Sequence, residues 1–286
     1  MRNEKSFSIE FDGRVLHGVS SAPLAPGRHP AVVICHGFKG FMEWGFFPFL
    51  ARLLAERGFC AVRFNFSGSG MQPGDELVTD PEAFRGATFS QDLRELRAIL
   101  GAVGKSIAAD CANPHRIALV GHSRGAGTAL LAAADENSSI KALITWAAVS
   151  SFDRLSARER DGWRQSGELE VVNTRTGQAL TIGPDVLTDL ETHASELDLF
   201  AAARRRSAPW LIVHGRDDET VSFSEAEHLR AVASEPTDLC PIEGGDHTFG
   251  ARHPFVGPTV PLTAAMNATQ IWLRRYLSPS GPSESD

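Results

Sequence analysis

Short apolar runs alternate along this chain with longer segments whose apolar residues recur every three or four positions, and this alternation restricts the possible folds most. The runs have the length of buried strands, and the longer segments have the period of helices. Strand, helix and strand in succession form crossover units, which join parallel strands. We therefore predict an α/β fold, a mostly parallel sheet flanked by helices. The predicted strands are 31–35, 59–64, 117–120, 142–146, 210–213 and 239–242, and the predicted helices are 47–57, 90–103, 125–135, 223–233 and 262–276.

The two ends of the chain differ from this pattern. At the start, 6–11 and 15–20 flank the turn-forming pair Asp12 and Gly13, which predicts an antiparallel hairpin. At the other end, 278–286 is rich in Ser and Pro, and we expect it to be disordered.

The segment 151–207 is too long for a simple crossover between two strands. Within it, 170–173 and 178–182 flank the turn-like stretch 174–177, with helical patterns on both sides. The sequence thus predicts an inserted cap containing a small β-hairpin. The expected organisation is a core made of 1–150 and 208–277, with the cap at 151–207.

Composition limits the function classes. The formal net charge is 28 − 35 = −7, and the only basic run, 204–206, is short, so we expect no nucleic-acid binding. No apolar stretch reaches the roughly 18 residues of a membrane span, and the first residues lack an apolar leader, so we expect no membrane association and a cytoplasmic protein. The oligomeric state is left open, a homodimer included.

The cysteines are widely spaced and are expected to be separate thiols: Cys35, Cys60, Cys111 and Cys240.

A candidate nucleophile lies at Ser123, in the sequence Gly-His-Ser-Arg-Gly at 121–125. The G-x-S-x-G pattern alone is weak, but an apolar run precedes it directly and a small-residue helical run follows. A sharp strand-to-helix turn would hold the serine in strained backbone angles and expose its hydroxyl above the sheet. The alternative is a glycine-rich turn that serves packing alone.

A serine hydroxyl needs a histidine to accept its proton and a carboxylate to orient that histidine, in the chain order Ser, acid, His. The strand at 210–213 leads into Asp217 and Asp218, and the strand ending at Ile242 leads into a glycine-bearing loop with Asp246 and His247. Loops at the carboxyl edge of an open α/β sheet are where sites form. His247 is thus the candidate base, and the three aspartates are candidate acids.

These residues resemble the α/β-hydrolase superfamily over nearly the whole chain outside the cap and the tail. The family pattern H-G-x-x-D-x-x-V falls on His214, Gly215, Asp218 and Val221, so the resemblance implies Asp218 as the acid. The family's oxyanion loop corresponds to His-Gly-Phe-Lys-Gly at 36–40. By position, the resemblance implies an oxyanion hole made by the backbone N–H groups of Phe38 and Arg124. A turn held by an imidazole hydrogen bond is a second, compatible interpretation of His36.

The sequence argues against two classes of cofactor. Four histidines fall near strand ends, but no H-x-x-x-H or Cys/His spacing accompanies them, so no metal is expected. They are His36, His122, His214 and His247. Gly68 and Gly70 lack the G-x-G-x-x-G spacing and a following helix, which argues against a dinucleotide site. No cofactor is expected.

Aromatic residues that follow the 36–40 loop are candidates for an apolar substrate pocket, joined by one from the cap and one from the His247 loop. Phe46 and Phe47 also have the spacing of a core-facing helix stripe with Leu50, so both interpretations stay open. Lys39 and Arg124 add positive charge at the mouth, unless they are merely solvated. The candidate pocket residues are Phe41, Trp44, Trp163 and Phe249.

Within the superfamily, the chain is similar to bacterial carboxylesterases of the cinnamoyl/feruloyl type and to dienelactone-hydrolase-like proteins, on the segments 36–38 and 63–70 and the hairpin-bearing cap. Dienelactone hydrolases use a cysteine nucleophile, whereas position 123 is serine. The sequence predicts a serine hydrolase that cleaves small-molecule carboxylic esters through an acyl-enzyme, with apolar or aromatic acyl groups. The alternatives are a thioesterase or peptidase with the same residues, or a non-catalytic ligand-binding protein of this fold.

Overall fold

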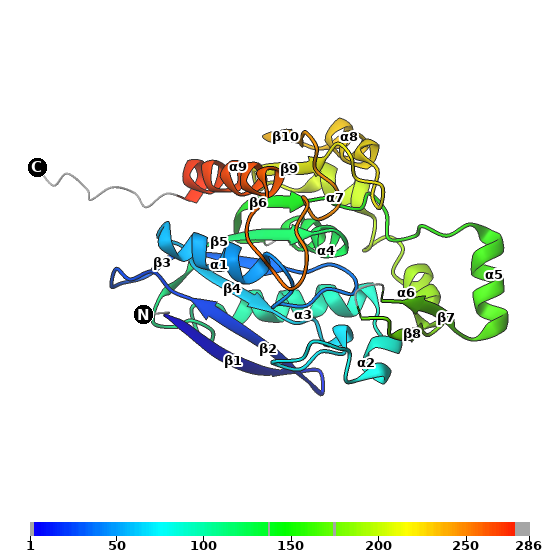
Figure 1. Cartoon of the computed structure of the whole chain (residues 1–286). Helices are drawn as coiled ribbons and strands as arrows, with labels where there is room; N and C mark the ends of the chain where they lie inside the picture. Colours follow the sequence, from blue (N-terminus) through cyan, green and yellow to red (C-terminus); the bar gives the residue numbers. More distant parts are fainter. Residues whose placement is uncertain (1–2, 137, 174–175, 278–286) are drawn as a thin grey trace, which may run out of the picture.

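The computed structural model describes residues 3–136, 138–173 and 176–277. An eight-stranded sheet runs through the molecule in the order β1-β2-β4-β3-β5-β6-β9-β10, and the strands from β4 to β10 are parallel (Figure 1). The predicted tail at 278–286 lies outside the described residues. The strand bounds are Glu4–Phe11 (β1), Arg14–Ser21 (β2), His29–Cys35 (β3), Cys60–Phe64 (β4), Ala112–His122 (β5), Ile140–Trp146 (β6), Trp210–Gly215 (β9) and Thr237–Ile242 (β10).

The N-terminal hairpin forms as the sequence predicts. β1 and β2 pair antiparallel in register from Glu4 with Ser21 to Phe11 with Arg14. Asp12 and Gly13 both have positive φ, 51° and 71°, which two-residue hairpin turns require. β2 also pairs antiparallel with β4, so the hairpin extends the parallel sheet at one edge.

Helices cover both faces of the sheet because its central strands are apolar on both sides. In β3, Val33 and Cys35 pack with one helix layer, and Val32 and Ile34 pack with the other. The first layer contains α3 (Phe89–Ala102), α4 (Arg124–Ala133), α7 (Leu199–Arg205) and α8 (Phe223–Val232); the second contains α1 (Phe47–Glu56) and α9 (Val260–Leu277). The sequence therefore specifies a three-layer α/β arrangement.

The insertion forms a small unit beside the carboxyl edge of the sheet (Figure 1). It contains α5 (Ala157–Ser166), an antiparallel pair of β7 (Leu169–Val172) and β8 (Ala179–Ile182), and α6 (Asp185–Thr192). Trp163, Val186 and Leu187 form its own apolar cluster. The following helix α7 packs against α4 and α8, so residues 199–205 join the sheet's helix layer although the predicted cap extends to 207. Residues 174–175 of the predicted hairpin turn lie outside the described residues. The short α2 (Pro81–Arg85) contacts β8, and a single 3₁₀ turn, η1 (Ser67–Ser69), follows β4.

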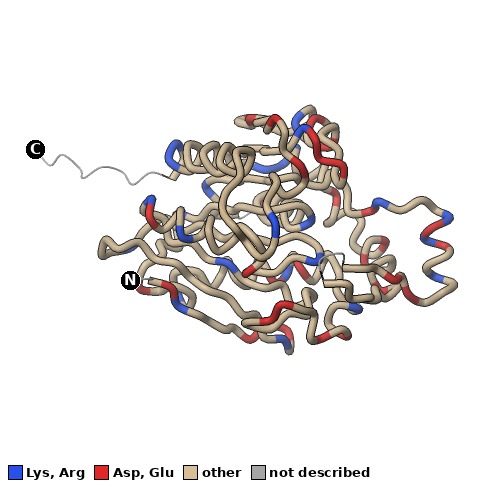
Figure 2. Tube along the Cα trace, viewed as in Figure 1, with Lys and Arg blue, Asp and Glu red and all other residues tan. Residues whose placement is uncertain are grey.

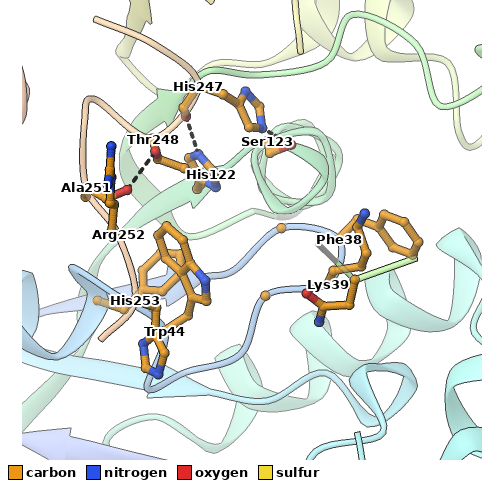
Figure 3. A pocket seen from close by; sticks show the side chains of 14 residues that line it. Phe38, Lys39, Trp44, His122, Ser123, His247, Thr248, Ala251, Arg252 and His253 are labelled. Atoms are coloured by element: carbon orange, nitrogen blue, oxygen red, sulfur yellow. Dashed lines mark hydrogen bonds between the residues drawn. The ribbon is translucent and has the colours of Figure 1, made fainter. Parts of the chain in front are cut away.

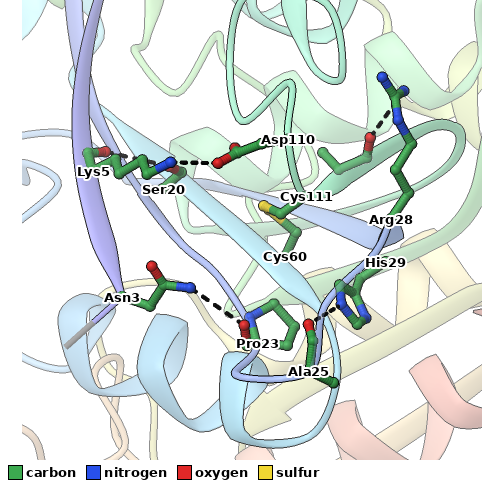
Figure 4. The surroundings of a disulfide bond; sticks show 11 residues. Asn3, Lys5, Ser20, Pro23, Ala25, Arg28, His29, Cys60, Asp110 and Cys111 are labelled. Carbon is green, nitrogen blue, oxygen red and sulfur yellow. Dashed lines mark hydrogen bonds and ion pairs between the residues drawn. A yellow bond between two sulfur atoms is a disulfide. The ribbon is translucent and has the colours of Figure 1, made fainter. Parts of the chain in front are cut away.

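One expectation about the cysteines is wrong. A disulfide joins Cys60, at the start of β4, to Cys111, which directly precedes β5 (Figure 4). The two residues are 51 positions apart in sequence, but β4 and β5 flank β3, so the fold brings their Cα atoms within 6.3 Å. Cys35 and Cys240 are free, and burial raises the pKa of both thiols. Within the part of the chain that the structure describes, no helix has the length and hydropathy to cross a bilayer.

Candidate active site

Ser123 occupies a sharp turn between β5 and α4. Its φ of 55° and ψ of −123° are strained for a residue with a side chain, and its N–H donates to the Trp146 carbonyl at 2.9 Å. The turn depends on its glycines, because a Cβ at Gly125 would lie 2.2 Å from the His36 carbonyl oxygen and one at Gly121 would lie 2.5 Å from the Ala126 Cα. The backbone thus holds the Ser123 hydroxyl at the carboxyl edge of the sheet.

Ser123, His247 and Asp218 are far apart in sequence but form a hydrogen-bonded chain at this edge. Figure 3 shows Ser123 and His247. The Nε2 atom of His247 lies 3.0 Å from the Ser123 Oγ, and its Nδ1 lies 2.8 Å from Oδ2 of Asp218. With the Nδ1 hydrogen donated to the carboxylate, Nε2 is free to accept the serine proton. The structure therefore brings together the predicted nucleophile, base and acid.

The Asp218 carboxylate is held in its charged form. Burial by itself raises the pKa of Asp218, but hydrogen bonds from His214, His247 and the Val221 N–H outweigh burial and bring the pKa below its ordinary value. Oδ1 accepts the N–H groups of Thr220 and Val221 at 2.9 and 2.8 Å. His214 is completely buried and lies 3.3 Å from Oδ2. Asp218 thus faces His247 as a fixed anion.

The other two candidate acids have different surroundings. Asp217 is exposed, and its N–H donates to the Gly245 carbonyl at 3.0 Å. Asp246 is exposed as well, and its Oδ1 accepts the N–H groups of Thr248 and Gly250 at 2.9 and 2.7 Å. Asp246 therefore shapes the loop that carries His247, while Asp218 contacts the ring.

The loop that follows β3 approaches the serine closely. A Cβ at Gly37 would lie 2.9 Å from the Ser123 Cβ, so only glycine allows this contact. His36 fixes the loop, since its Nδ1 donates to the Gly37 carbonyl at 2.9 Å and its Nε2 accepts the Phe66 N–H at 3.1 Å. Burial lowers the pKa of His36 to about 4, so its ring is neutral. Within the described residues, the N–H groups of Phe38 and Arg124 donate to no protein acceptor.

The Arg124 side chain is paired with a buried carboxylate. Its Nε and Nη2 donate to Oδ2 of the buried Asp92 at 3.0 and 2.6 Å, and its guanidinium lies over the rings of Phe38 and Phe89. Burial raises the pKa of Asp92 to about 6 despite the opposing effect of Arg124. Arg124 therefore lines the side of the site next to the insertion as a cation already paired with Asp92, whereas Lys39 lines the side next to His247.

Two cavities meet at Ser123 and Phe38. One lies between the insertion and the sheet, measures about 300 Å³ and is mainly apolar; its walls include Phe89, Val149, Phe152, Leu155, Trp163, Leu169, Ile182, Val186 and Leu187. The other measures about 460 Å³ and adjoins His247 (Figure 3); its walls include Lys39, Trp44, Phe47, His122, Asn173, Thr248, Ala251, Arg252 and His253. We name them the apolar cavity and the basic cavity.

The predicted aromatic pocket residues divide into two groups. Trp163 lines the apolar cavity and Trp44 the basic cavity. Phe41 and Phe249 are buried, at 2% and 0% exposure, and line neither cavity, which corrects the prediction for both. Phe249 packs against Trp146 in the core, and Phe41 packs on the His253 ring. The stripe Phe46, Phe47 and Leu50 is buried in the core, and Phe47 also reaches the basic cavity.

The histidines near the strand ends use ring nitrogens for hydrogen bonds to the protein. Nε2 of His122 lies 2.8 Å from the His247 carbonyl, and Nε2 of His214 lies 2.8 Å from the Val221 carbonyl. Among the described residues, no group of three or more His, Cys, Asp or Glu side chains is arranged to hold a metal ion.

Part of the site carries no recognisable sequence pattern. Asn173, Thr248, Arg252 and His253 line the basic cavity, but they belong to no recognised pattern. The one sequence signal for Arg252 and His253 is their position shortly after His247. Asn173 comes from the insertion, and only the fold brings it to the site.

Comparison with known proteins agrees with this fold. The profile of the alpha/beta hydrolase family matches residues 32–257, and the chain belongs to this family. A curated relative, 2,6-dihydropseudooxynicotine hydrolase from Paenarthrobacter nicotinovorans, is 27% identical over 240 residues, which cover 80% of this chain and 56% of the relative. An uncharacterized 31.7 kDa protein from Escherichia coli is 26% identical over 172 residues. The chain thus spans about half the length of the curated relatives it matches.

Solved structures share the fold. Est1E from Butyrivibrio proteoclasticus with bound ferulic acid has a TM-score of 0.71 at 22% identity, covering 96% of this chain and 100% of that one. A dienelactone hydrolase from Anabaena variabilis has a TM-score of 0.63 at 17% identity, covering 96% and 99%. The chain is a hydrolase-family protein, similar in fold to both.

Proposed function

We propose that this protein is a serine hydrolase that cleaves carboxylic esters through an acyl-enzyme intermediate. The observation that carries the proposal is the unbroken hydrogen-bonded chain from Ser123 through His247 to Asp218, with distances of 3.0 and 2.8 Å. Hydrolase-family membership and the esterase neighbours support it.

In this mechanism, the Ser123 Oγ attacks the ester carbonyl carbon while Nε2 of His247 takes its proton. The negative charge on the carbonyl oxygen is stabilised by the free N–H groups of Phe38 and Arg124, which can each contribute on the order of 3 kcal/mol. His247 then donates its proton to the leaving alcohol. Water, activated by the same ring, releases the acid and restores Ser123.

Asp218 acts through His247. Its carboxylate accepts the Nδ1 hydrogen, which selects the ring tautomer with a free Nε2 and stabilises the imidazolium that forms. The apolar cavity favours apolar or aromatic acyl groups. A thioester or peptide would use the same residues, and a substrate panel separates these cases.

A fluorophosphonate probe tests the proposal, because it labels only an activated serine. We expect stoichiometric labelling of the wild type at Ser123, with loss of both labelling and 4-nitrophenyl butyrate hydrolysis in Ser123→Ala. Ser106→Ala is the matched control, since Ser106 is exposed and distant in sequence from the turn. A folded wild type that is neither labelled nor active would favour a non-catalytic ligand-binding protein.

Cytoplasmic residence, expected from composition, stays a proposal. The Cys60–Cys111 disulfide weighs against it, because cytosolic glutathione and thioredoxin keep most thiols reduced. Cell fractionation of the tagged native protein, with a count of its free thiols, tests the location.

A further inference from the structure

The basic cavity has a charge that differs from that of the rest of the molecule. The chain has a formal net charge of −7, and its acidic residues are spread over the insertion, α8 and the hairpin edge (Figure 2). Among the residues that the structure describes, those lining this cavity include Lys39 and Arg252 but no Asp or Glu. The chain as a whole is acidic, whereas the charged side chains described on this cavity wall are basic. The local charge of the cavity is therefore opposite in sign to the net charge of the chain.

The two cations stay available to a ligand. Lys39 has a φ of 57°, and its Nζ donates to the Val172 carbonyl of β7 at 3.3 Å, which leaves two ammonium hydrogens. Arg252 forms no ion pair with any residue the structure describes. Glu76 is hydrogen-bonded at 2.7 Å to His253, a residue of the cavity wall, but does not itself line the cavity. Figure 3 shows Lys39 and Arg252 on opposite sides of the cavity.

The position of His247 determines which part of a substrate would enter this cavity. His247 lines the basic cavity and not the apolar one. This step rests on the proposed function. In that mechanism Nε2 of His247 protonates the leaving alcohol, so the alcohol must depart next to that atom. The acyl group then extends into the apolar cavity, and the alcohol portion lies between Lys39 and Arg252.

We propose that the preferred substrates are esters whose leaving alcohol carries an anionic group, a carboxylate or a phosphate, which Lys39 and Arg252 bind. Arg252 offers a planar pair of donors and Lys39 a point charge, and both form charge-assisted hydrogen bonds with such groups. The Asn173 amide, on the same cavity wall, supplies a polar group without charge. The chemistry at Ser123 is that of the proposed function, and this inference adds the recognition of the leaving group.

Matched acetyl esters test the inference: 4-acetoxybenzoate, with a charged leaving group, against the neutral 4-acetoxybenzamide, with 4-acetoxyphenyl phosphate as a second anion. We expect the wild-type kcat/KM ratio of charged to neutral ester to exceed that of Lys39→Gln/Arg252→Gln by about tenfold or more, mainly through KM. Comparing ratios between proteins cancels the intrinsic reactivity of each ester. The wild-type preference should also decrease as salt is raised. The relative rates of the two anionic esters identify the preferred anion.

Arg57→Gln/Lys105→Gln is the control variant, because both residues are exposed outside both cavities and their joint loss changes the net charge by the same −2 as the test variant. Monophenyl succinate against phenyl butyrate places the charge on the acyl side instead. No preference is expected there, because the two arginines that line the apolar cavity, Arg124 and Arg154, are already paired with Asp92 and Glu225. Ser123-dependent turnover with a ratio that the double variant leaves unchanged overturns this inference and leaves the proposed function standing. Absence of Ser123-dependent turnover of every ester overturns both.

Discussion

His122 is hydrogen-bonded to the backbone of His247: its Nε2 donates to the His247 carbonyl oxygen at 2.8 Å. The two rings also lie 4.9 Å apart, and His122 packs edge-on against Phe46 and Phe47. Burial, followed by the nearby His247, lowers the pKa of His122 to about 3, so the ring stays neutral and keeps the Nε2 hydrogen. The residue before the nucleophile thus anchors the loop that carries the proposed base.

His122→Phe should separate this anchoring from packing. Phenylalanine keeps an aromatic ring against Phe46 and Phe47 but removes the donor to the His247 carbonyl. We expect kcat for a small neutral ester to decrease about tenfold to a hundredfold with a small change in KM, because a displacement of His247 by a fraction of an ångström weakens proton transfer. Stopped-flow and steady-state kinetics measure the two constants.

The control is Thr248→Val, which removes a different hydrogen bond of the same loop, from Thr248 Oγ1 to the Ala251 carbonyl. We expect a smaller decrease there, because Thr248 does not hold His247 directly. Equal effects of both variants on kcat would show that His122 has no special part in positioning His247.

Asp218→Asn tests the orientation of His247 with little change of shape. The asparagine amide donates to Nδ1 in place of accepting from it, so the hydrogen moves to Nε2, which then cannot take the serine proton. We expect kcat to decrease by about 10³ to 10⁴, with Asp217→Asn and Asp246→Asn as the matched controls. Wild-type kcat in Asp218→Asn would show that another residue is the acid.

The fold and two members of the hydrogen-bonded chain, Ser123 and His247, are predictable from sequence because their determinants are local. Ser123 is marked by its flanking glycines and by the apolar run before it, and His247 lies on a glycine-bearing loop just after a strand. Asp218 needed the family pattern, since nothing local separates it from Asp217. What distinguishes them is burial against His214, a tertiary property.

The remaining features depend on contacts between distant segments. An aromatic residue near a site is equally suited to core or pocket, and only packing places Phe249 against Trp146 and Trp44 at the basic cavity. The Cys60–Cys111 pairing depends on strand order, which chain spacing does not reveal. Local pattern therefore specifies elements, and their tertiary arrangement determines which side chains meet.

Trp163→Ala should change acyl-chain preference. Trp163 is 5% exposed, lines the apolar cavity and is fixed by a hydrogen bond from Nε1 to the Ile182 carbonyl at 3.1 Å. In the wild type, each buried methylene contributes about 0.8 kcal/mol, so kcat/KM should rise about fourfold per carbon until the 300 Å³ cavity is full. The variant should lose this slope for 4-nitrophenyl butyrate and hexanoate while acetate changes little. Val256→Ala is the control, because Val256 is 94% exposed. If kcat/KM still rises with acyl-chain length in Trp163→Ala as in the wild type, the acyl group lies elsewhere.

Acid should destabilise the fold through its buried imidazoles. Burial lowers the pKa of His36 to about 4 and that of His122 to about 3, from an ordinary 6.5. Below about pH 6.5 the unfolded chain protonates both rings while the folded chain does not, so the unfolding free energy decreases as pH falls toward 4. Each such histidine contributes a slope of about 1.4 kcal/mol per pH unit. Asp92 acts in the opposite direction, because its pKa is raised from 3.8 to about 6 and the folded state holds the extra proton between these values.

Near pH 5, the two histidines and Asp92 therefore leave a net uptake of about one proton on unfolding from these three groups. Asp92→Asn removes the opposing group, so the slope of unfolding free energy against pH should steepen by about 1.4 kcal/mol per unit, while His36→Gln should make it shallower by the same amount. Urea unfolding between pH 4.5 and 6 measures each slope, and Asp217→Asn, at an exposed site, is the control. Each slope is measured within one variant, so a constant loss of unfolding free energy caused by the substitution does not change it. Parallel slopes for wild type and His36→Gln would show that the His36 ring already carries its proton in the folded state at pH 5.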